Sequence, residues 1–540
     1  MQRFTLLAST AFLLTAPLAP TAFAAQIAEG DTLAEDQTFS YSLLDQFPTL
    51  DPQLNEEVQG SHIIAQLFEG LTRQDADGNV IPAGATEWTN ENNTVWTFKL
   101  REDARWSNGE PVTASDYVYA WRRAADPETA SPYAWYVELS SIEGAAEVVA
   151  GEAEPETLGV EAVDDHTLKV TLTQPLPFFP AVVTYATFMP TPQTTIEQHG
   201  SDWTSPGNMV SNGAYTLAEL AVNEYFRLEK NPEYWNADEV IITEVTGYII
   251  NDRNQSVTRW EAGEFDMMDD LPAGTYPDLL EQYPDETFST PRLCSYYYAI
   301  NFSESGNPAL QDVNVRKALS YALNREVIVD QVLKGGQSPA YNFAHEATAG
   351  FEMPEIDYAA WSQSERMERA RELMAEAGYG PDNPLDLDLI YNTSDSHKAI
   401  ATVAAQMWKP LGVNITLSNY EWQSYIDIRG EQNFDLARSG WCGDYNEAST
   451  FLDLVTTTHG SNDGKYSNAE VDRLMTESRT MDDPNEAYTQ VEQILADEMA
   501  IIPIYHYTQN FLLDADIRNW PMNNVENNWY IQDIYRAASE

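Results

Sequence analysis

The sequence predicts an α/β protein made of several domains, and three observations support this. The chain has 540 residues, 43% of them hydrophobic, which is enough for roughly two to four domains with substantial cores. Short alternating segments and helical segments are mixed in its first third. Near residue 400 an alternating segment, an amphipathic helix and a second alternating segment follow one another. That order is typical of parallel strands joined by a right-handed crossover.

The first third contains three segments with the period-two alternation of half-buried strands. They are FSYSLLD (39–45), VWTFKLRE (95–102) and HTLKVTLTQ (166–174). Apolar residues recur at helical spacing in ASDYVYAWRRAAD (114–126), which predicts a helix between the second and third strands. DADGN (75–79) predicts a hairpin turn, because its glycine comes too early for a calcium-binding loop.

The later part of the chain is expected to form an α/β domain. Residues 312–336 predict one long helical stretch that ends at two glycines. Residues 362–378 predict a second helix, with Ser362 and Glu365 at capping-box spacing. The crossover unit then consists of a strand, a helix and a strand at 385–392, 395–412 and 413–422.

Asn392 and His397 stand where the first strand of the crossover unit meets its helix. Ligands of α/β domains bind beyond the carboxyl ends of the strands, where helix amino termini present free N–H groups to anions. The two residues are therefore candidates for a binding site. A helix cap and a surface histidine would explain them equally well.

The chain is strongly acidic, since 85 acidic residues against 29 basic ones give a formal net charge of −56. Acidic residues are spread along the whole chain instead of forming a tail, which indicates a solvated surface, as in proteins adapted to high salt. Attraction of cationic ligands is the alternative interpretation. Either way, the charge argues against binding to nucleic acids or anionic membranes.

Residues 1–24 have the organisation of a cleavable secretory signal peptide. A basic residue precedes an apolar stretch, and small residues lead to a cleavage site near Ala24. A membrane anchor is the alternative, but Pro17 and Pro20 interrupt the apolar run. No cysteine stands near the cleavage point to carry a lipid, so we expect a freely diffusing periplasmic protein.

If the protein is exported, its two cysteines, Cys294 and Cys442, are expected to form a structural disulfide. In an oxidising compartment such a pair is more often a disulfide than two free thiols. The bridge would close a loop of 442 − 294 = 148 positions, which the chain-entropy model values at roughly 5 kcal/mol. Two cysteines without histidines at ligand spacing do not suit zinc, and no metal or cofactor is expected.

The sequence contains no motif typical of catalysis. A nucleophile elbow, a phosphate-binding glycine loop, a His-Glu-x-x-His helix and a Cys-x-x-Cys pair are all missing from the 540 residues. A glycosidase-like carboxylate pair does not stand out among 85 acids. We therefore predict a binding protein and no enzyme, with a secreted hydrolase as the remote alternative.

Seven stretches match motifs of a known protein family. Four are shared across a wide class, namely LDPQLNEEV (50–58), the region 95–136, SNGAYTL (211–217) and NPEYW (231–235). Three are more specific, namely LCSYYYAINF (293–302), YNTSDSH (391–397) and ARSGWCGDYNEAS (437–449). Over nearly the whole chain after the signal peptide, the sequence resembles the oligopeptide-binding proteins of bacterial peptide ABC transporters.

The resemblance implies a periplasmic solute-binding fold. Two lobes joined by a hinge would close on a ligand in the manner of a Venus flytrap, with an additional domain on one side. The chain would cross between the lobes more than once. The expected segments are lobe I at 25–68, 192–292 and 509–540, the additional domain at 69–191, and lobe III at 293–508.

The same resemblance implies roles for individual residues. Asp444 would pair with the α-ammonium of an extended peptide. The two edges of the peptide would pair with the backbone of Glu56, Glu57 and Val58 and with that of Gly440, Trp441 and Cys442. The groups expected to meet the peptide carboxylate are Arg438, Arg429 and His397, with Asn392 beside them, and those walling side-chain pockets are Trp422, Trp441, Tyr133 and Tyr297.

Two positions and one segment depart from the family pattern. Leu333 stands where the family has a lysine, with Lys334 one position later, and Glu57 stands where a glycine is expected. The segment 267–272 also looks shorter than its counterpart. These differences concern pocket shape, and the added acidity leads to the hypothesis that basic peptides are preferred.

We therefore expect a monomeric extracytoplasmic receptor that binds short peptides and delivers them to the permease subunits of an inner-membrane ABC transporter. A receptor for dipeptides, murein peptides or another solute on the same fold is the alternative. No nucleic acid partner is expected.

Overall fold

The computed structural model describes residues 25–538, apart from residues 45, 273 and 482. The predicted signal peptide, residues 1–24, lies outside the described residues. None of the helices in the described part of the chain is both long enough and apolar enough to span a membrane.

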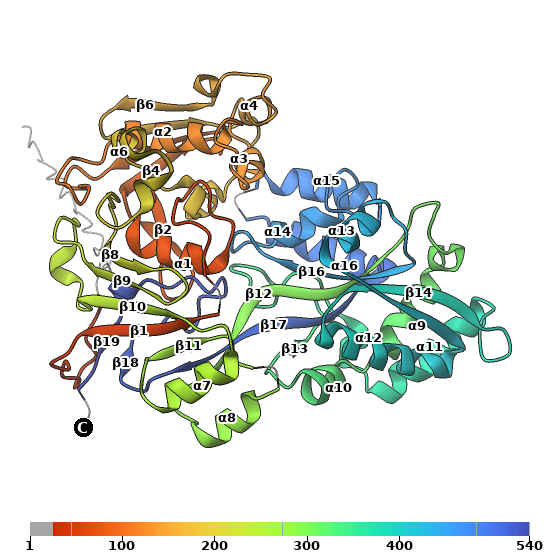
Figure 1. Ribbon diagram of the computed structural model, residues 1–540. Helices are drawn as coiled ribbons and strands as arrows, with labels where there is room; N and C mark the ends of the chain where they lie inside the picture. Colours follow the sequence, from red (N-terminus) through yellow and green to blue (C-terminus); the bar gives the residue numbers. More distant parts are fainter. Residues whose placement is uncertain (1–24, 45, 273, 482, 539–540) are drawn as a thin grey trace, which may run out of the picture.

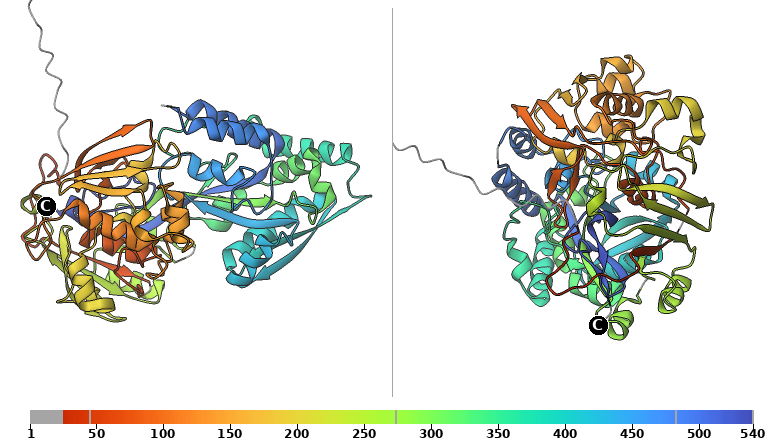
Figure 2. Two further views of the ribbon diagram at one scale, coloured as in Figure 1. Left: turned by 90° about the horizontal axis from the view of Figure 1, so that it is seen from above. Right: turned by 90° about the vertical axis from the view of Figure 1, so that its left-hand side faces the viewer.

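A mixed eleven-stranded sheet runs through the length of the molecule (Figures 1 and 2). In spatial order its strands are β15 (Val413–Tyr420), β14 (Leu385–Asn392), β16 (Leu436–Cys442), β12 (Thr287–Ile300), β17 (Ile501–Leu513), β11 (Met267–Asp269), β1 (Thr38–Leu43), β10 (Glu244–Ile249), β9 (Tyr225–Lys230) and β8 (Tyr215–Ala221), with β13 (Ser338–Pro339) paired to β17.

The long strands β12 and β17 join the two lobes. They are antiparallel, and the first part of β12 pairs with the end of β17 beside lobe I, while its second part pairs with the start of β17 in lobe III (Figure 1). The register shifts between Pro291 and Ser295, and such irregularities bend and twist a ladder. The lobe connection is therefore a pair of hydrogen-bonded strands and not a loose linker.

The additional domain is built on its own antiparallel sheet, which α2 (Ala114–Ala125) covers (Figure 1). That sheet has the order β4 (Ala85–Glu91), β5 (Val95–Leu100), β7 (Thr167–Thr171) and β6 (Val160–Asp164). Nearby lie the hairpin of β2 (Thr72–Gln74) and β3 (Val80–Pro82) and the helices α3 (Ala134–Leu139), α4 (Ala145–Val149), α5 (Phe179–Val182) and α6 (Gln193–His199).

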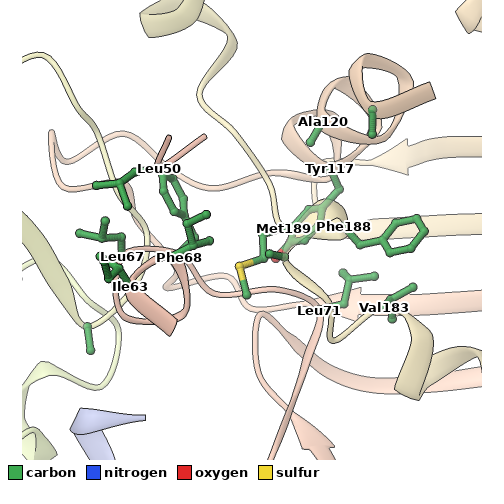
Figure 3. Close-up of a cluster of buried hydrophobic side chains, with 14 of the residues drawn as sticks. Leu50, Ile63, Leu67, Phe68, Leu71, Tyr117, Ala120, Val183, Phe188 and Met189 are labelled. Carbon is green, nitrogen blue, oxygen red and sulfur yellow. The ribbon is translucent and has the colours of Figure 1, made fainter. Parts of the chain in front are cut away.

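Lobe I and the additional domain share one hydrophobic core. Leu50, Ile63 and Leu67 come from around α1 (Val58–Leu67) in lobe I, and they belong to the same buried cluster as Tyr117 and Phe188 of the additional domain (Figure 3). Separating the two would expose this apolar surface at roughly 25 cal/mol per Å². The two therefore pack as one body.

Lobe III packs helices on both faces of its part of the sheet (Figure 1). One face carries α9 (Val313–Ala322), α10 (Arg325–Val327), α11 (Gln363–Glu376) and α12 (Asp395–Trp408). The other carries α13 (Trp422–Gly430), α14 (Ser449–Leu452), α15 (Ala469–Ser478) and α16 (Asn485–Glu498). The remaining elements belong to lobe I and are α7 (Arg253–Glu261), α8 (Tyr276–Gln282), β18 (Ile517–Arg518) and β19 (Tyr535–Arg536).

The predicted elements are confirmed at most positions. The early strands correspond to β1, β5 and β7, the helix between the last two corresponds to α2, and DADGN forms the turn between β2 and β3. Strands β14 and β15 are parallel with α12 between them. The capping box of Ser362 and Glu365 is present at the start of α11.

The single long helix predicted at 312–336 is wrong. Helix α9 ends at Ala322, and Leu323 leaves the helix with extended backbone angles. The side chain of Asn324 then caps a new helix by accepting a hydrogen bond from the backbone N–H of Val327, which is the preferred role of asparagine at such a position. This short helix, α10, continues as a π-helix over Ile328–Leu333, and Lys334 after it has a positive φ of 56°.

The predicted disulfide between Cys294 and Cys442 is present. The two residues face each other in the β12 and β16 ladder. The bridge therefore anchors the end of β16 to a strand that passes between the lobes.

Replacing both cysteines with serine is expected to lower the free energy of unfolding by about 2 to 5 kcal/mol, because the bridge restricts the unfolded chain. Urea unfolding of the wild type and the double variant, followed by tryptophan fluorescence, measures this difference. Intact mass with and without reductant is the control, and two free thiols in the exported protein would contradict the assignment.

Candidate functional site

Strand β16 has a free edge at the boundary between the lobes. Its partner β12 runs along one side as far as Cys442, but β14 pairs with the other side only at Leu436 and Ala437. Within the described ranges no strand pairs with that side from residue 438 to 442. An unpaired edge of this kind can accept an added strand through its backbone N–H and C=O groups.

Asp444 lies just beyond this edge, between β16 and α14. Its backbone N–H donates to the Thr450 hydroxyl at 3.1 Å, and its carbonyl accepts from the Tyr136 hydroxyl at 3.3 Å. Among the described residues no cation contacts the half-buried Asp444 carboxylate. Burial therefore raises the pKa of Asp444 to about 7. When it ionises, the Asp444 carboxylate has no compensating cation among the described residues.

Tyr133 belongs to the additional domain, and its side chain lies near carboxylates of both lobes. Its ring stacks on that of Tyr185 with 5.0 Å between centroids. The pKa of Tyr133 is raised, first by burial and then by the charges of Asp444 and Glu56. Glu56 precedes α1 in lobe I, so carboxylates of both lobes lie near this one ring of the additional domain.

Glu526 is a second half-buried acid near Asp444 that sequence reasoning missed. Its carboxylate accepts a hydrogen bond from Gln74. Burial and, to a smaller extent, the charge of Asp444 raise the pKa of Glu526 to about 7. Among 85 acidic residues no sequence signal distinguishes this one, because its burial depends on contacts between distant segments.

Arg438 occupies the other end of the free edge. Its guanidinium donates to the Tyr507 hydroxyl at 2.9 Å and to the Asn392 amide oxygen at 3.5 Å, and it lies over the ring of Tyr296 at 5.1 Å. Every one of these partners is neutral. In the part of the chain that the structure describes, no carboxylate pairs with Arg438.

His397 lies near Arg438, in the first turn of α12 and 5.6 Å from the Tyr296 ring. The family resemblance implies a cationic group at this position. Burial and the nearby Arg438 charge instead lower the pKa of His397 to about 3, so the imidazole is neutral at physiological pH. An incoming carboxylate would oppose this shift.

Other predicted site residues are placed differently from Arg438. Arg429 at the end of α13 forms an ion pair with Asp463. Tyr297 is only 7% exposed and packs against Phe343 in the lobe III core. Trp422 at the start of α13 is 55% exposed, so its ring is available to a ligand.

The lobe I segment predicted to line the ligand lies at the start of α1. Glu57 is the N-cap residue, with extended backbone angles, and Val58 is the first helical residue. Val58 is 48% exposed. Across the residues that are described, no group of three or more His, Cys, Asp or Glu side chains is arranged to hold a metal ion.

Asp444→Asn is expected to change how stability depends on pH. The folded-state pKa of about 7 lies above the reference value of 3.8, so the wild type loses stability as the pH rises from about 4 to about 7, and the variant avoids this loss. Urea unfolding without ligand should show that the free energy of unfolding of the variant, relative to that of the wild type, increases by about 2 kcal/mol between pH 4 and pH 8. Glu147→Gln, at an exposed position of α4, is the control, and an equal gain there would contradict the assignment.

Sequence comparisons identify relatives that span nearly the whole chain. A family described as bacterial extracellular solute-binding proteins, family 5 Middle, matches residues 79–463. The periplasmic oligopeptide-binding protein OppA of Escherichia coli (strain K12) is 41% identical over 519 residues, covering 95% of each chain. The periplasmic murein peptide-binding protein MppA of the same organism is 40% identical over 517 residues, covering 95% of this chain and 96% of MppA.

Solved structures show the same fold. The unliganded open form of MppA superposes with a TM-score of 0.88 at 39% identity, covering 95% of this chain and 99% of that one. OppA of Haemophilus influenzae, in complex with the peptide RPPGFSPFR, superposes with a TM-score of 0.73 at 37% identity, covering 94% and 100%. The lobes are thus arranged more as in the open form than as in the peptide complex. Together the matches show that this chain belongs to family 5 of the bacterial extracellular solute-binding proteins.

Proposed function

We propose that the protein is an extracytoplasmic receptor that binds short peptides with free termini and delivers them to an inner-membrane ABC permease. The observation that carries this proposal is the charge pattern of the free β16 edge. An uncompensated carboxylate, Asp444, lies at one end, and Arg438, a cation with only neutral partners, lies at the other. A zwitterionic peptide has the complementary charges at its two ends.

The spacing of these charges fits a short extended ligand. The two residues are 444 − 438 = 6 positions apart, or about 20 Å along a strand at about 3.3 Å per residue. Allowing for the reach of both side chains, this length corresponds to peptides of roughly three to five residues. The peptide would run antiparallel to β16, with its amine at Asp444.

Backbone pairing would make the affinity largely independent of the peptide sequence. Within this proposal Gly440, Trp441 and Cys442 pair with one edge of the peptide, and Glu56, Glu57 and Val58 approach the other as the lobes close. Trp422 and Tyr133 supply apolar walls, while Asn392 and His397 lie near the carboxylate end. Arg429 and Tyr297 act indirectly, by supporting lobe III.

The open arrangement suits a receptor that closes on its ligand. When a peptide ammonium pairs with Asp444, closing the lobes no longer encloses an unpaired charge. The ligand therefore binds the closed state more tightly than the open state and shifts the equilibrium toward it. We infer that lobe III closes against the joint body of lobe I and the additional domain. The proposed boundaries are lobe I at 25–68, 192–292 and 509–540, the additional domain at 69–191, and lobe III at 293–508.

We further propose that the chain acts in the periplasm as a monomer without enzymatic activity, after removal of residues 1–24. The alternative is a receptor for murein peptides or another solute. It has support because relatives on this fold include MppA and a probable deoxycholate-binding periplasmic protein, YgiS, which is 36% identical over 521 residues. A free strand edge between opposite charges favours peptides over a bile acid, which offers no backbone to pair.

The Asp444 role is tested by calorimetry with trialanine and acetyl-trialanine. The wild type is expected to bind the free amine about 100-fold more tightly, which corresponds to about 2.7 kcal/mol, because acetylation leaves the enclosed carboxylate unpaired. Asp444→Asn should remove this preference. Equal affinity of the wild type for both peptides would refute the assignment, and cleaved products would support a hydrolase.

The Arg438 role is tested with trialanine and its carboxyl-terminal amide. Arg438→Gln is expected to weaken binding of the free acid about 30-fold while leaving the amide nearly unchanged. Arg429→Gln is the matched control, because Arg429 is already paired with Asp463, and it should lower stability without changing the acid-to-amide ratio. The same ratio change in both variants would argue against a specific role for Arg438.

A further inference from the structure

The chain just after β16 contacts the additional domain, although it belongs to lobe III. The carbonyl of Asp444 accepts a hydrogen bond from the Tyr136 hydroxyl of α3 at 3.3 Å. The ring of Tyr445 stacks on that of Phe178, with 4.4 Å between the ring centroids and 15° between the planes. Figure 1 shows α3 of the additional domain facing α14, which follows these residues in lobe III. The contact is present while the lobes are arranged more as in the open form.

Tyr445 is anchored in the hydrophobic core on the other side of the lobe boundary. Its side chain is 4% exposed and belongs to the buried cluster that lobe I and the additional domain share. In the part of the chain that the structure describes, it is the only residue between 293 and 508 in that cluster. Asn446 extends the contact, because a Cβ added to Gly78 would lie 3.2 Å from the Asn446 amide nitrogen. A buried aromatic ring contributes strongly to the stability of such an interface.

A second anchor runs in the opposite direction beside Gly443. Val525, from the C-terminal segment of lobe I, is 5% exposed and belongs to a buried cluster of lobe III. Its carbonyl accepts a hydrogen bond from the backbone N–H of Leu293 at 2.6 Å, and the Leu293 carbonyl accepts one from the N–H of Gly443 at 2.8 Å. Asp444 is therefore fixed through both of its neighbours in the chain, Gly443 and Tyr445.

Arg438 lies at the other end of the free β16 edge and is attached differently. Its partners are Asn392, Tyr507 and the ring of Tyr296, all within lobe III. The two ends of the edge therefore differ, since only the Asp444 end is bound to the additional domain. When two bodies rotate about the points that they share, displacement grows with distance from those points. Closure therefore moves the Asp444 end least and the Arg438 end more, relative to the additional domain.

We propose that Tyr445 is a positioning residue, which holds Asp444 on the axis of lobe closure and completes the amine-binding end of the site before the lobes close. The inference rests on the proposed function, in which Asp444 binds the peptide amine and Arg438 binds its carboxylate. A peptide then binds in a fixed order. Its amine docks first, in the open form, and its carboxylate is secured as the lobes close. The amine therefore governs the rate of association, and the carboxylate governs the rate of dissociation.

Stopped-flow tryptophan fluorescence of the wild type tests this order with trialanine, acetyl-trialanine and trialanine amide. Acetylation is expected to slow association at least about 10-fold, because it removes the group that docks first. Amidation is expected to change the association rate less than about 2-fold and to speed dissociation about 30-fold. Equal slowing of association by the two modifications would overturn the proposed order.

Two variants remove the ring stack from opposite sides, Tyr445→Leu and Phe178→Leu. Each is expected to lower the preference for the free amine from about 100-fold to about 10-fold or less, with the acid-to-amide ratio unchanged. Tyr445→Phe keeps the stack, loses only the hydroxyl contact with Ser449 and should keep the preference near 100-fold. Tyr358→Leu is the matched control, because that ring is 3% exposed and lies 4.5 Å from the Tyr321 ring inside lobe III. It should lower stability and change neither ratio.

The outcomes separate this inference from the proposed function. A free-amine preference that stays near 100-fold in both stack-breaking variants would overturn the role of Tyr445 and leave the receptor intact. The same fall in Tyr358→Leu, or an equal fall of both ratios in Tyr445→Leu, would also overturn it, because a general loosening of lobe III would then explain the effect. No binding of trialanine by the wild type would reject the proposed function itself.

Discussion

The pairing of β12 with β17 is the constraint on which the rest of the molecule depends. These two strands carry the sheet from one lobe to the other, with a register shift between Pro291 and Ser295. Every strand of lobe III is attached, directly or through a neighbour, to this pair. The bridge from Cys294 to Cys442 adds a covalent link at the same place, so that β16 presents its free edge at a fixed position beside the boundary between the lobes.

The position of β16 beside the lobe boundary explains why the charges of the site lack partners in the described part of the chain. A buried ion is costly unless an opposite charge meets it, and both Asp444 and Glu526 have pKa values raised to about 7 by burial. Lobe I and lobe III each contribute one of these acids. In the proposed mechanism the ammonium of the ligand removes the penalty at Asp444, so charge recognition and lobe closure are energetically coupled.

The sequence predicts local elements well and long-range placement only through family resemblance. The alternation of apolar residues is enough for β1 and β14, and the Ser362 capping box is enough for the start of α11. The break at Leu323 is not predicted by the sequence, because apolar periodicity continues across it. The neutral state of His397 and the burial of Glu526 depend on residues far away in the chain, and no local pattern contains that information.

The use of arginine gives the clearest physical reason to assign a ligand to Arg438. The chain has only 29 basic residues against 85 acidic ones, and the buried arginines Arg73 and Arg325 are each held by several acceptors of the chain. Arg73 pairs with Asp533 at 2.5 Å, and Arg325, which is 0% exposed, donates to several backbone carbonyls. Arg438 instead has a hydroxyl, an amide oxygen and a ring. Its Nε has no hydrogen-bond partner in the described part of the chain, whereas the Nε of Arg325 donates to two backbone carbonyls. This difference supports our proposal that the partner of Arg438 is an anion from outside the chain.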